Sequence, residues 1–211
     1  IFKVLRKYIQ ESRKVRFEGD GYSDDWEKEA EKRGLTNIAI VPEALKGYIQ
    51  EQSLDLFDRQ EVLSREESHA RYLIRLEMFV KNIQIEARVL GDLVINHILP
   101  TALRYQNTII ENVRGLQAIF DEGSYMDVAG GKLDTIKRIA KHTSIIRSKV
   151  PEMINERKVA NKMEDLEEKA SYYAAKVRPM LDDIRYEVDK LELIVDDEMW
   201  PLPKYRELLT S

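Results

Sequence analysis

The 211-residue sequence contains no cysteine, and this absence removes several classes of protein. Without thiols the chain forms no disulfide, no cysteine-ligated zinc site and no thiolate nucleophile. Gly130-Gly131-Lys132 resembles the end of a phosphate-binding loop, but Met126 and Leu133 stand where that loop needs a glycine and a hydroxyl residue. No set of serine, histidine and acid stands out either. The residues alone therefore indicate no catalytic equipment.

Long apolar runs and clustered charge are also missing. No run approaches the roughly 20 apolar residues that a bilayer-spanning helix needs, and the start has no secretory signal pattern. The net charge is −4, and lysine and arginine are spread along the sequence without the basic patch typical of nucleic-acid binding. We therefore expect no membrane partner, no nucleic-acid partner and a cytoplasmic location.

The most regular stretch runs from Ser64 to Phe120. Ser64 followed by Glu67 forms a capping box, in which each side chain satisfies a backbone N–H of the other at a helix start. Apolar residues then recur in steps of three and four, which predicts a long helix packed along its length against other helices. These residues are Leu73, Leu76, Val80, Ile83, Ala87, Leu90 and Val94.

The pattern after Val94 predicts further long helices with interruptions. Pro100 indicates a kink near residues 96–99, because proline lacks the N–H and crowds the preceding turn. We expect a loop over residues 121–131, a second helix with a kink or brief break at Pro151, and a third helix over residues 163–195. The predicted fold is all-α, a long antiparallel helical bundle or hairpin with kinked long helices.

Short helices are expected before Ser64. They comprise an amphipathic helix over residues 1–16, a helix between Ser23 and Gly34, a helix beginning at Pro42, and another through Leu54. Because the chain begins with Ile1 in mid-helix, we expect it to be cut from a longer one. We divide it into short helices over residues 1–62 and a long-helix bundle with a docked tail over residues 63–211.

The candidate metal ligands are sparse. Glu66 and His69 form one Glu-x-x-His motif, whereas di-iron carboxylate bundles need two such motifs and two further glutamates. His97 and His142 have no acid three residues before them. We therefore expect capping or surface roles for Glu66 and His69, and neither a metal nor a cofactor in this chain.

Polar residues gather on the kinked part of the long helix. They form either a solvated face or a hydrogen-bonded contact with another domain or subunit, and the aliphatic seam beside them favours the contact. The apolar, proline-containing tail from Met199 to Leu209 is expected to dock on the chain's own bundle or on a neighbouring subunit. Asp196, Asp197 and Glu198 follow the third helix, and we expect them to be solvated, to lie past a helix break or to meet a cationic partner. The residues predicted to make contacts are Asn96, His97, Arg104, Tyr105, Asn107, Trp200 and Tyr205.

Three ordered strings resemble the C-terminal part of type III glutamine synthetase, the long bacterial form. They are GDGYSDDW over residues 19–26 with its continuation to Leu35, the run from Ile83 to Leu116, and the stretch from Asp189 to Leu209. The resemblance covers essentially the whole chain. By this resemblance, residues 1–62 are the last helices of a catalytic domain and the remainder is the extra helical region of the long form.

The resemblance implies a parent enzyme that joins ammonia to glutamate with ATP and Mg or Mn ions. It also implies a homo-oligomer, in which this chain contacts the rest of the catalytic domain and neighbouring subunits. The family's catalytic and ligand-binding residues would precede Ile1, so the chain alone is expected to be inactive. The alternative is a stand-alone helical interaction module without activity. A third hypothesis places a small-molecule regulatory site near His97 and Arg104.

Overall fold

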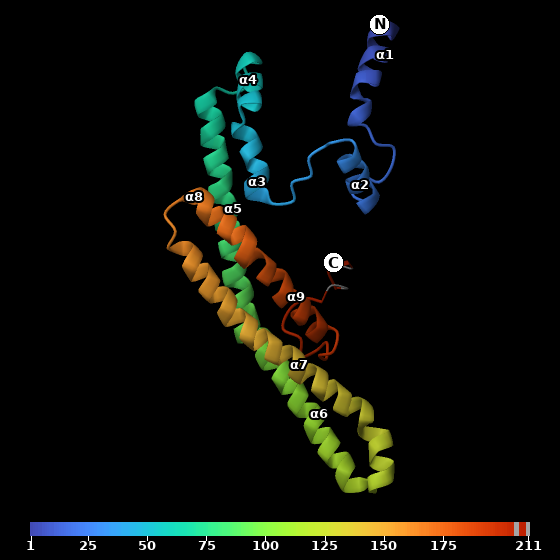
Figure 1. The fold of residues 1–211 in the computed structure, drawn as a ribbon. Coiled ribbons are helices and arrows are strands. Elements are labelled where there is room, and N and C mark those ends of the chain that lie inside the picture. Colours follow the sequence, from blue (N-terminus) through green and yellow to red (C-terminus); the bar gives the residue numbers. More distant parts are fainter. Residues whose placement is uncertain (205–206, 210–211) are drawn as a thin grey trace.

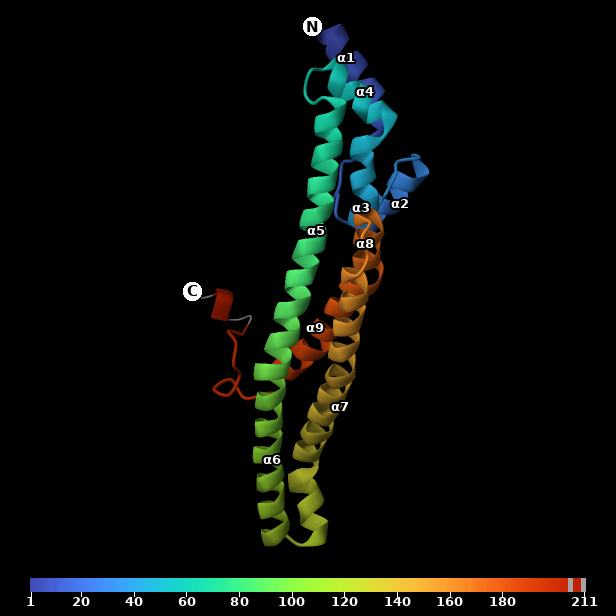
Figure 2. The same ribbon diagram turned by 90° about the vertical axis from the view of Figure 1, so that its left-hand side faces the viewer.

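The computed structural model describes residues 1–204 and 207–209, and all regular structure in these residues is helical. Figure 1 shows an elongated molecule of long helices that run side by side, with shorter helices at one end. α5 (Arg65–Leu93), η3 (Val94–Ile98) and α6 (Leu99–Ile119) form one continuous rod (Figure 2). α7 (Glu122–Asn161) returns beside the rod, and α8 (Leu166–Tyr172), η4 (Tyr173–Val177) and α9 (Arg178–Glu192) turn back along the bundle. The predicted all-α fold with long helices is confirmed.

The long rod begins with the predicted capping box. The Ser64 Oγ accepts a hydrogen bond from the Glu67 N–H at 3.1 Å, and the Ser64 N–H donates to Glu67 Oε2 at 2.8 Å. These two bonds satisfy backbone donors that have no partner within the helix. The local sequence therefore fixes where the rod starts.

The buried face of α5 follows the predicted seam with one correction. Leu76, Val80, Ile83 and the later seam residues face the core, but Leu73 is 48 % exposed. Its neighbour Tyr72 is buried in its place. Periodicity predicts which side of a helix is buried. At this end of α5, the packing of α3 and α8 buries Tyr72 instead of its neighbour.

Two prolines follow π-helical segments at the same spacing. η3 ends two residues before Pro100, and η4 ends two residues before Pro179. Proline cannot donate to the carbonyl four residues earlier and its ring crowds that turn, which a wider π turn relieves. The interruption expected before Pro100 is thus a π segment, after which the helix continues.

α7 starts earlier than predicted and is not broken at its internal proline. The predicted loop over residues 121–131 is wrong, because Asp121 caps a helix that begins at Glu122, its Oδ1 accepting from the Ser124 N–H at 2.9 Å. A helix that begins at Glu122 places the following glycines inside its first turns. α7 also runs through Pro151 without a break. Val150 and Met153 beside this proline are buried, so packing holds the helix across it.

The short helices form the end of the molecule that precedes Ser64. They are α1 (Phe2–Glu11), η1 (Ser12–Lys14), α2 (Asp24–Lys32), α3 (Val41–Leu45), η2 (Lys46–Ile49) and α4 (Glu51–Arg59). Ser23 caps α2 as predicted, and Gly34 follows its end with φ +66°. α3 and η2 pack on the main core, whereas α1 has no buried residue and lies to one side in Figure 1.

The tail docks on the chain's own bundle. Trp200 is only 7 % exposed and belongs to the main core, which α5, α6, α7, α8 and α9 build together. Lys204 is also buried, and the short η5 covers Glu207–Leu209. Of the two docking alternatives, the described part of the tail takes the intramolecular one.

Candidate functional site

The residues predicted to make contacts lie in different environments. Asn96, His97, Arg104 and Asn107 are exposed on η3 and α6. Tyr105 is half-buried and packs against the core. Trp200 is buried within it, and the prediction for Tyr205 lies outside the described residues. The structure therefore separates a polar surface from two aromatic residues that serve the core.

Side chains of the polar surface form hydrogen bonds with residues one turn away on the same helix. The Asn96 Nδ2 donates to Asp92 Oδ1 at 2.6 Å, and the Arg104 Nη2 donates to Thr101 Oγ1 at 2.9 Å. Gln106 instead points across the hairpin, its Nε2 donating to the Ile136 carbonyl at 3.0 Å. In this single chain the polar surface faces solvent, and its use as a subunit contact stays a prediction.

Lys204 anchors the tail to the preceding residues of the chain through three contacts. Its Nζ donates to the Val195 carbonyl at 2.9 Å, lies 2.5 Å from Asp197 Oδ1, and stands 5.9 Å from the centroid of the Trp200 ring. The cationic partner foreseen for the acidic residues after the third helix thus exists for Asp197, within the same chain. α9 also ends at Glu192, so the acidic residues lie past the helix end.

A histidine and a glutamate meet between α7 and α9. His142 Nδ1 lies 2.6 Å from Glu187 Oε2, with the two side chains 14 % and 13 % exposed. The adjacent Thr143 hydroxyl donates to the Ile139 carbonyl at 2.8 Å, so it is not held for activation by the imidazole. This arrangement joins two helices. Sequence reasoning missed it because 45 positions separate the two residues.

The candidate metal motif is not completed by other ligands. Glu66 and His69 are both exposed near the start of α5. Its own backbone N–H and the Ser64 hydroxyl hold the pKa of Glu66 below its usual value. Within residues 1–204 and 207–209, no three His, Asp or Glu side chains come together to hold a metal ion. Among the described residues, Glu66 and His69 therefore lack the further ligands that a di-iron site needs.

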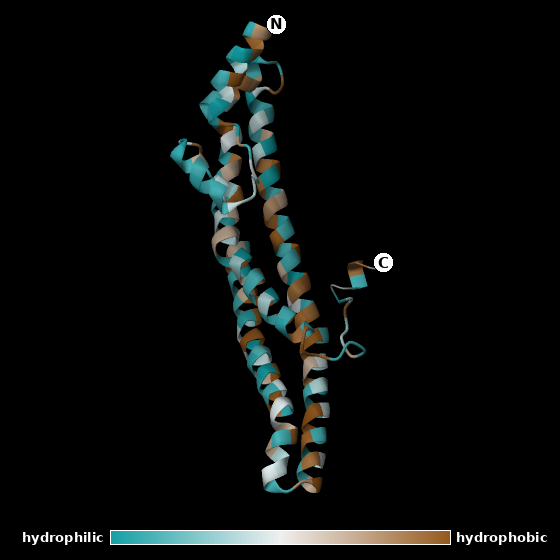
Figure 3. Cartoon of the chain, turned by 90° about the vertical axis from the view of Figure 1, so that its right-hand side faces the viewer, coloured by the Kyte–Doolittle hydropathy of each residue, from teal (hydrophilic) through white to brown (hydrophobic). Residues whose placement is uncertain are grey.

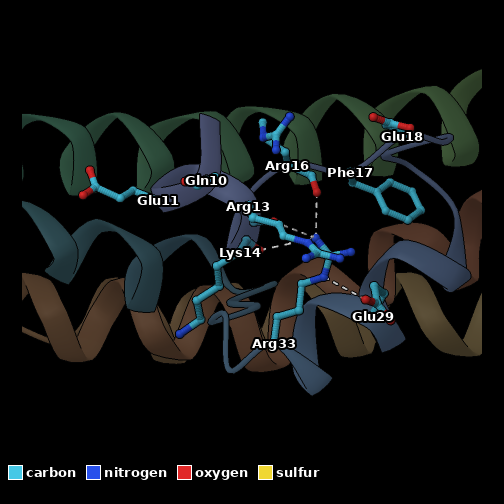
Figure 4. Close-up of a pocket in the computed structure, with 9 residues that line it drawn as sticks. All are labelled: Gln10, Glu11, Arg13, Lys14, Arg16, Phe17, Glu18, Glu29 and Arg33. Carbon is cyan, nitrogen blue, oxygen red and sulfur yellow. Dashed lines mark hydrogen bonds and ion pairs between the residues drawn. The ribbon is translucent and has the colours of Figure 1, made fainter. Parts of the chain in front are cut away.

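A hollow of about 830 Å³ lies between η1 and α2 (Figure 4). The Arg33 Nη1 donates to the Arg16 carbonyl at 2.6 Å, and its Nε donates to Glu29 Oε1 at 2.7 Å. This hydrogen bond from Arg33 lowers the pKa of Glu29. The Phe17 and Trp26 rings lie 4.6 Å apart beside them. Arg33 thus connects the turn after α1 to α2. We interpret the hollow as part of this structural contact and not as a binding site.

The hollow lies beside a cluster of positive charge that the sequence analysis missed. Residues 1–16 contain six basic residues and one acidic residue, whereas the whole chain has a net charge of −4. A charge count in short windows finds this cluster, which the whole-chain composition conceals. The basic residues are Lys3, Arg6, Lys7, Arg13, Lys14 and Arg16.

Comparison with known proteins identifies the family. The model of the glutamine synthetase C-terminal domain matches residues 1–117. The chain belongs to this family. The match to the glutamine synthetase C-terminal domain runs from α1 almost to the end of α6, across the division expected at residue 62, so the domain division stays a proposal. Within the described residues, no helix is both long enough and apolar enough to cross a membrane.

Complete relatives of this glutamine synthetase C-terminal domain are much longer. The chain is 46 % identical over 209 residues to a glutamine synthetase of Bacteroides fragilis, covering 99 % of this chain and 29 % of that protein. It is 31 % identical to the type-3 glutamine synthetase of Dictyostelium discoideum, covering 98 % of this chain and 28 % of that protein. A glutamine synthetase of Butyrivibrio fibrisolvens is 28 % identical, with 99 % and 29 % covered. The chain thus spans less than a third of these relatives.

Proposed function

We propose that this chain is the structural and assembly region at the C-terminus of a longer, bacterial type III glutamine synthetase. The parent enzyme would join ammonia to glutamate with ATP and Mg or Mn ions. The observation that carries the proposal is the 46 % identity over 99 % of the chain to a glutamine synthetase of which it covers 29 %. The other 71 % of such a protein would hold the catalytic groups.

The contacts of the charged and polar side chains favour a structural role for this chain. His142 and Glu187 join helices, Lys204 holds the tail, and Arg33 fastens a turn. Each of these side chains already has a partner within the chain. We therefore assign the binding of ATP and metal ions to the remainder of the parent polypeptide, and no reaction step to the residues described here.

α1 is the surface that we assign to the rest of the catalytic domain. Phe2 is 88 % exposed, and Leu5 and Ile9 on the same helix are more than half exposed. An amphipathic helix of this kind is stable when its apolar face is covered, and its basic residues favour an acidic partner surface. Neighbouring subunits of a homo-oligomer would contact the exposed Asn96 and His97 surface. The parent protein would act in the cytoplasm.

A direct test compares the complete protein with the 211-residue chain. Glutamine formation from glutamate, ammonia and ATP with Mg²⁺ is expected for the complete protein and not for the chain alone. Activity of the isolated chain would overturn the structural role. An inactive complete protein that nevertheless folds and assembles would overturn the assignment of ligase activity.

A stand-alone interaction module is the second candidate. It is favoured by the core of the bundle, because buried residues between Tyr72 and Trp200 form one contiguous cluster. The reading frame upstream of Ile1 distinguishes the candidates. Continuation into a catalytic region supports the enzyme, whereas a start codon directly before Ile1 supports the module.

A further inference from the structure

α5 carries a second apolar stripe on the side that faces away from its own bundle. Ile74, Met78, Ile85 and Val89 are 55 %, 56 %, 58 % and 51 % exposed. At 100° per residue, these positions lie roughly 180° around the helix from Leu76 and the other buried seam residues. Hydrophobic residues recur along the whole length of α5 in Figure 3. A helix that is apolar on two opposite sides is suited to packing between two layers.

The second stripe is symmetric about one point of the helix, midway between Lys81 and Asn82. Met78 and Ile85 are equally far from this midpoint, and so are Ile74 and Val89. A twofold contact between identical chains requires that two residues exchange places across the axis. Two antiparallel copies of α5 that cross at the midpoint would therefore place Met78 against Ile85 of the second copy, and Ile74 against Val89 of the second copy.

The charges at the ends of the stripe have the same symmetry. Arg71 and Asp92 are also equally far from the midpoint, so the antiparallel arrangement brings the arginine of each copy to the aspartate of the other. A parallel arrangement in register would instead place each Arg71 against its like. Like charges in direct contact are unfavourable by several kcal/mol at an interface, so the charges select the antiparallel orientation.

The edges of the stripe are complementary as well. Arg75 and Glu86 lie about three turns apart on one edge of α5, and Glu77 and Arg88 lie about three turns apart on the other. In the antiparallel pair, each arginine comes within about two residues of the opposing glutamate along the same edge. These two pairs therefore oppose unlike charges, whereas the two copies of Lys81 lie nearest each other beside the axis, each paired with Glu77 of its own chain at 2.9 Å.

We propose that the outer face of α5, defined by Ile74, Met78, Ile85 and Val89, binds the same face of a second copy of this chain around a twofold axis. This deepens the assembly role in the proposed function and requires no ligase activity. The apolar surface continues from Val89 into a hollow of about 500 Å³ beside α9, which Leu90, Leu93 and Leu181 help to line. The contact differs from the polar surface at Asn96 and His97 and would add a second interface to an oligomer.

Cysteine cross-linking tests this geometry, because the chain has no cysteine of its own. The complete protein is used, with any cysteine outside this chain first replaced by serine. Two differently tagged proteins, one with Ile74→Cys and one with Val89→Cys, are expected to form a mixed disulfide dimer under mild oxidation. Each variant alone is the control, since its two copies would be roughly 22 Å apart along the helices at 1.5 Å per residue. Cross-linking of both single variants, or of neither the singles nor the mixture, would overturn the antiparallel contact.

Substitutions provide an independent measurement of association. Met78→Glu with Ile85→Glu is expected to weaken self-association at least about tenfold by analytical ultracentrifugation, because it places four carboxylates at the axis. Ile119→Glu, at a more exposed apolar position at the far end of α6, is the control and should leave association unchanged. Arg71→Asp should also weaken association, and adding Asp92→Arg should restore it. Unchanged association in the double glutamate variant would overturn the proposal, whatever the same protein shows in a glutamine synthesis assay.

Discussion

The imidazole Nδ1 of His142 lies 2.6 Å from the Glu187 carboxylate, and this contact joins α7 to α9 in the middle of the bundle. Both side chains are largely shielded from water, so each depends on the other for its hydrogen bond. If one of the two side chains is removed, the other stays desolvated without a hydrogen bond, which lowers the stability of the folded state. The pair therefore contributes to the packing of the last long helix.

Glu187→Ala is expected to lower the free energy of unfolding by about 1–3 kcal/mol, because it leaves the largely shielded imidazole without its partner. A double-mutant cycle with His142→Ala should give a coupling energy of about 0.5–3 kcal/mol in urea denaturation. The matched control is Asp182→Ala, which breaks the exposed pair of Asp182 with Arg178 and should cost no more than about 1 kcal/mol. Equal effects at the two sites would contradict this prediction.

Tyr72 should make the protein less stable at high pH. Burial and the nearby Glu167 carboxylate raise the pKa of Tyr72 to about 12. The unfolded tyrosine ionises near its ordinary value of about 10, so the unfolded state loses the proton first and stability falls as the pH rises from about 10 to 12. The expected slope from this group is at most about 1.4 kcal/mol per pH unit.

The measurement compares the unfolding free energy of the wild type and Tyr72→Phe between pH 9 and 11.5. The Phe variant should show the shallower decline. Tyr22→Phe is the control, because that side chain is fully exposed and should leave the slope unchanged. Identical slopes for the wild type and Tyr72→Phe would show that Tyr72 ionises normally.

Lys204→Met is expected to release the tail. The substitution keeps an apolar stem but removes the donor to the Val195 carbonyl and the charge beside Asp197. We expect a loss of about 1–2 kcal/mol, typical of a hydrogen bond from a charged donor. In a Trp26→Phe background, the fluorescence of Trp200 should shift to the red as the ring meets water. Asp197→Asn, which keeps the carbonyl contact, should shift it less, and a larger shift there would contradict the assigned roles.

Ser64→Ala should destabilise the protein by about 1 kcal/mol, because it removes the side-chain acceptor at the start of α5. Ser148→Ala is the matched control in the middle of α7, where the Ser148 Oγ donates to the Ile145 carbonyl. Alanine has the higher helix propensity there, so that variant should be neutral or slightly more stable. Thermal unfolding of the two variants measures the difference directly.

The sequence predicted the features that depend on neighbouring residues. The capping box at Ser64, the cap at Ser23 and the left-handed Gly34 each need only a few consecutive residues. Core periodicity was also readable, because a helix buries one side at intervals of three and four residues. Periodicity predicted that Leu73 is buried, but Tyr72 is buried in its place. Which of two neighbouring residues is buried depends on the helix that packs there.

The features that could not be predicted join distant parts of the chain. Sequence spacing gives no sign that His142 meets Glu187, or that Gln106 donates to the carbonyl of Ile136. The loop expected over residues 121–131 failed for a different reason. Its glycines suggested a turn, but Asp121 supplies a cap and the antiparallel packing of α6 on α7 favours helix from the next residue.

The two π segments decide where the chain tolerates a change in length. A π turn accommodates one residue more than an α turn, so a single deletion within Val94–Ile98 or Tyr173–Val177 can be absorbed by a return to α geometry. The same deletion between Leu76 and Ala87 would rotate every later core residue by about 100° relative to the earlier ones. Single-residue gaps in the long helices of distant relatives should therefore fall at these two places, each just ahead of a proline.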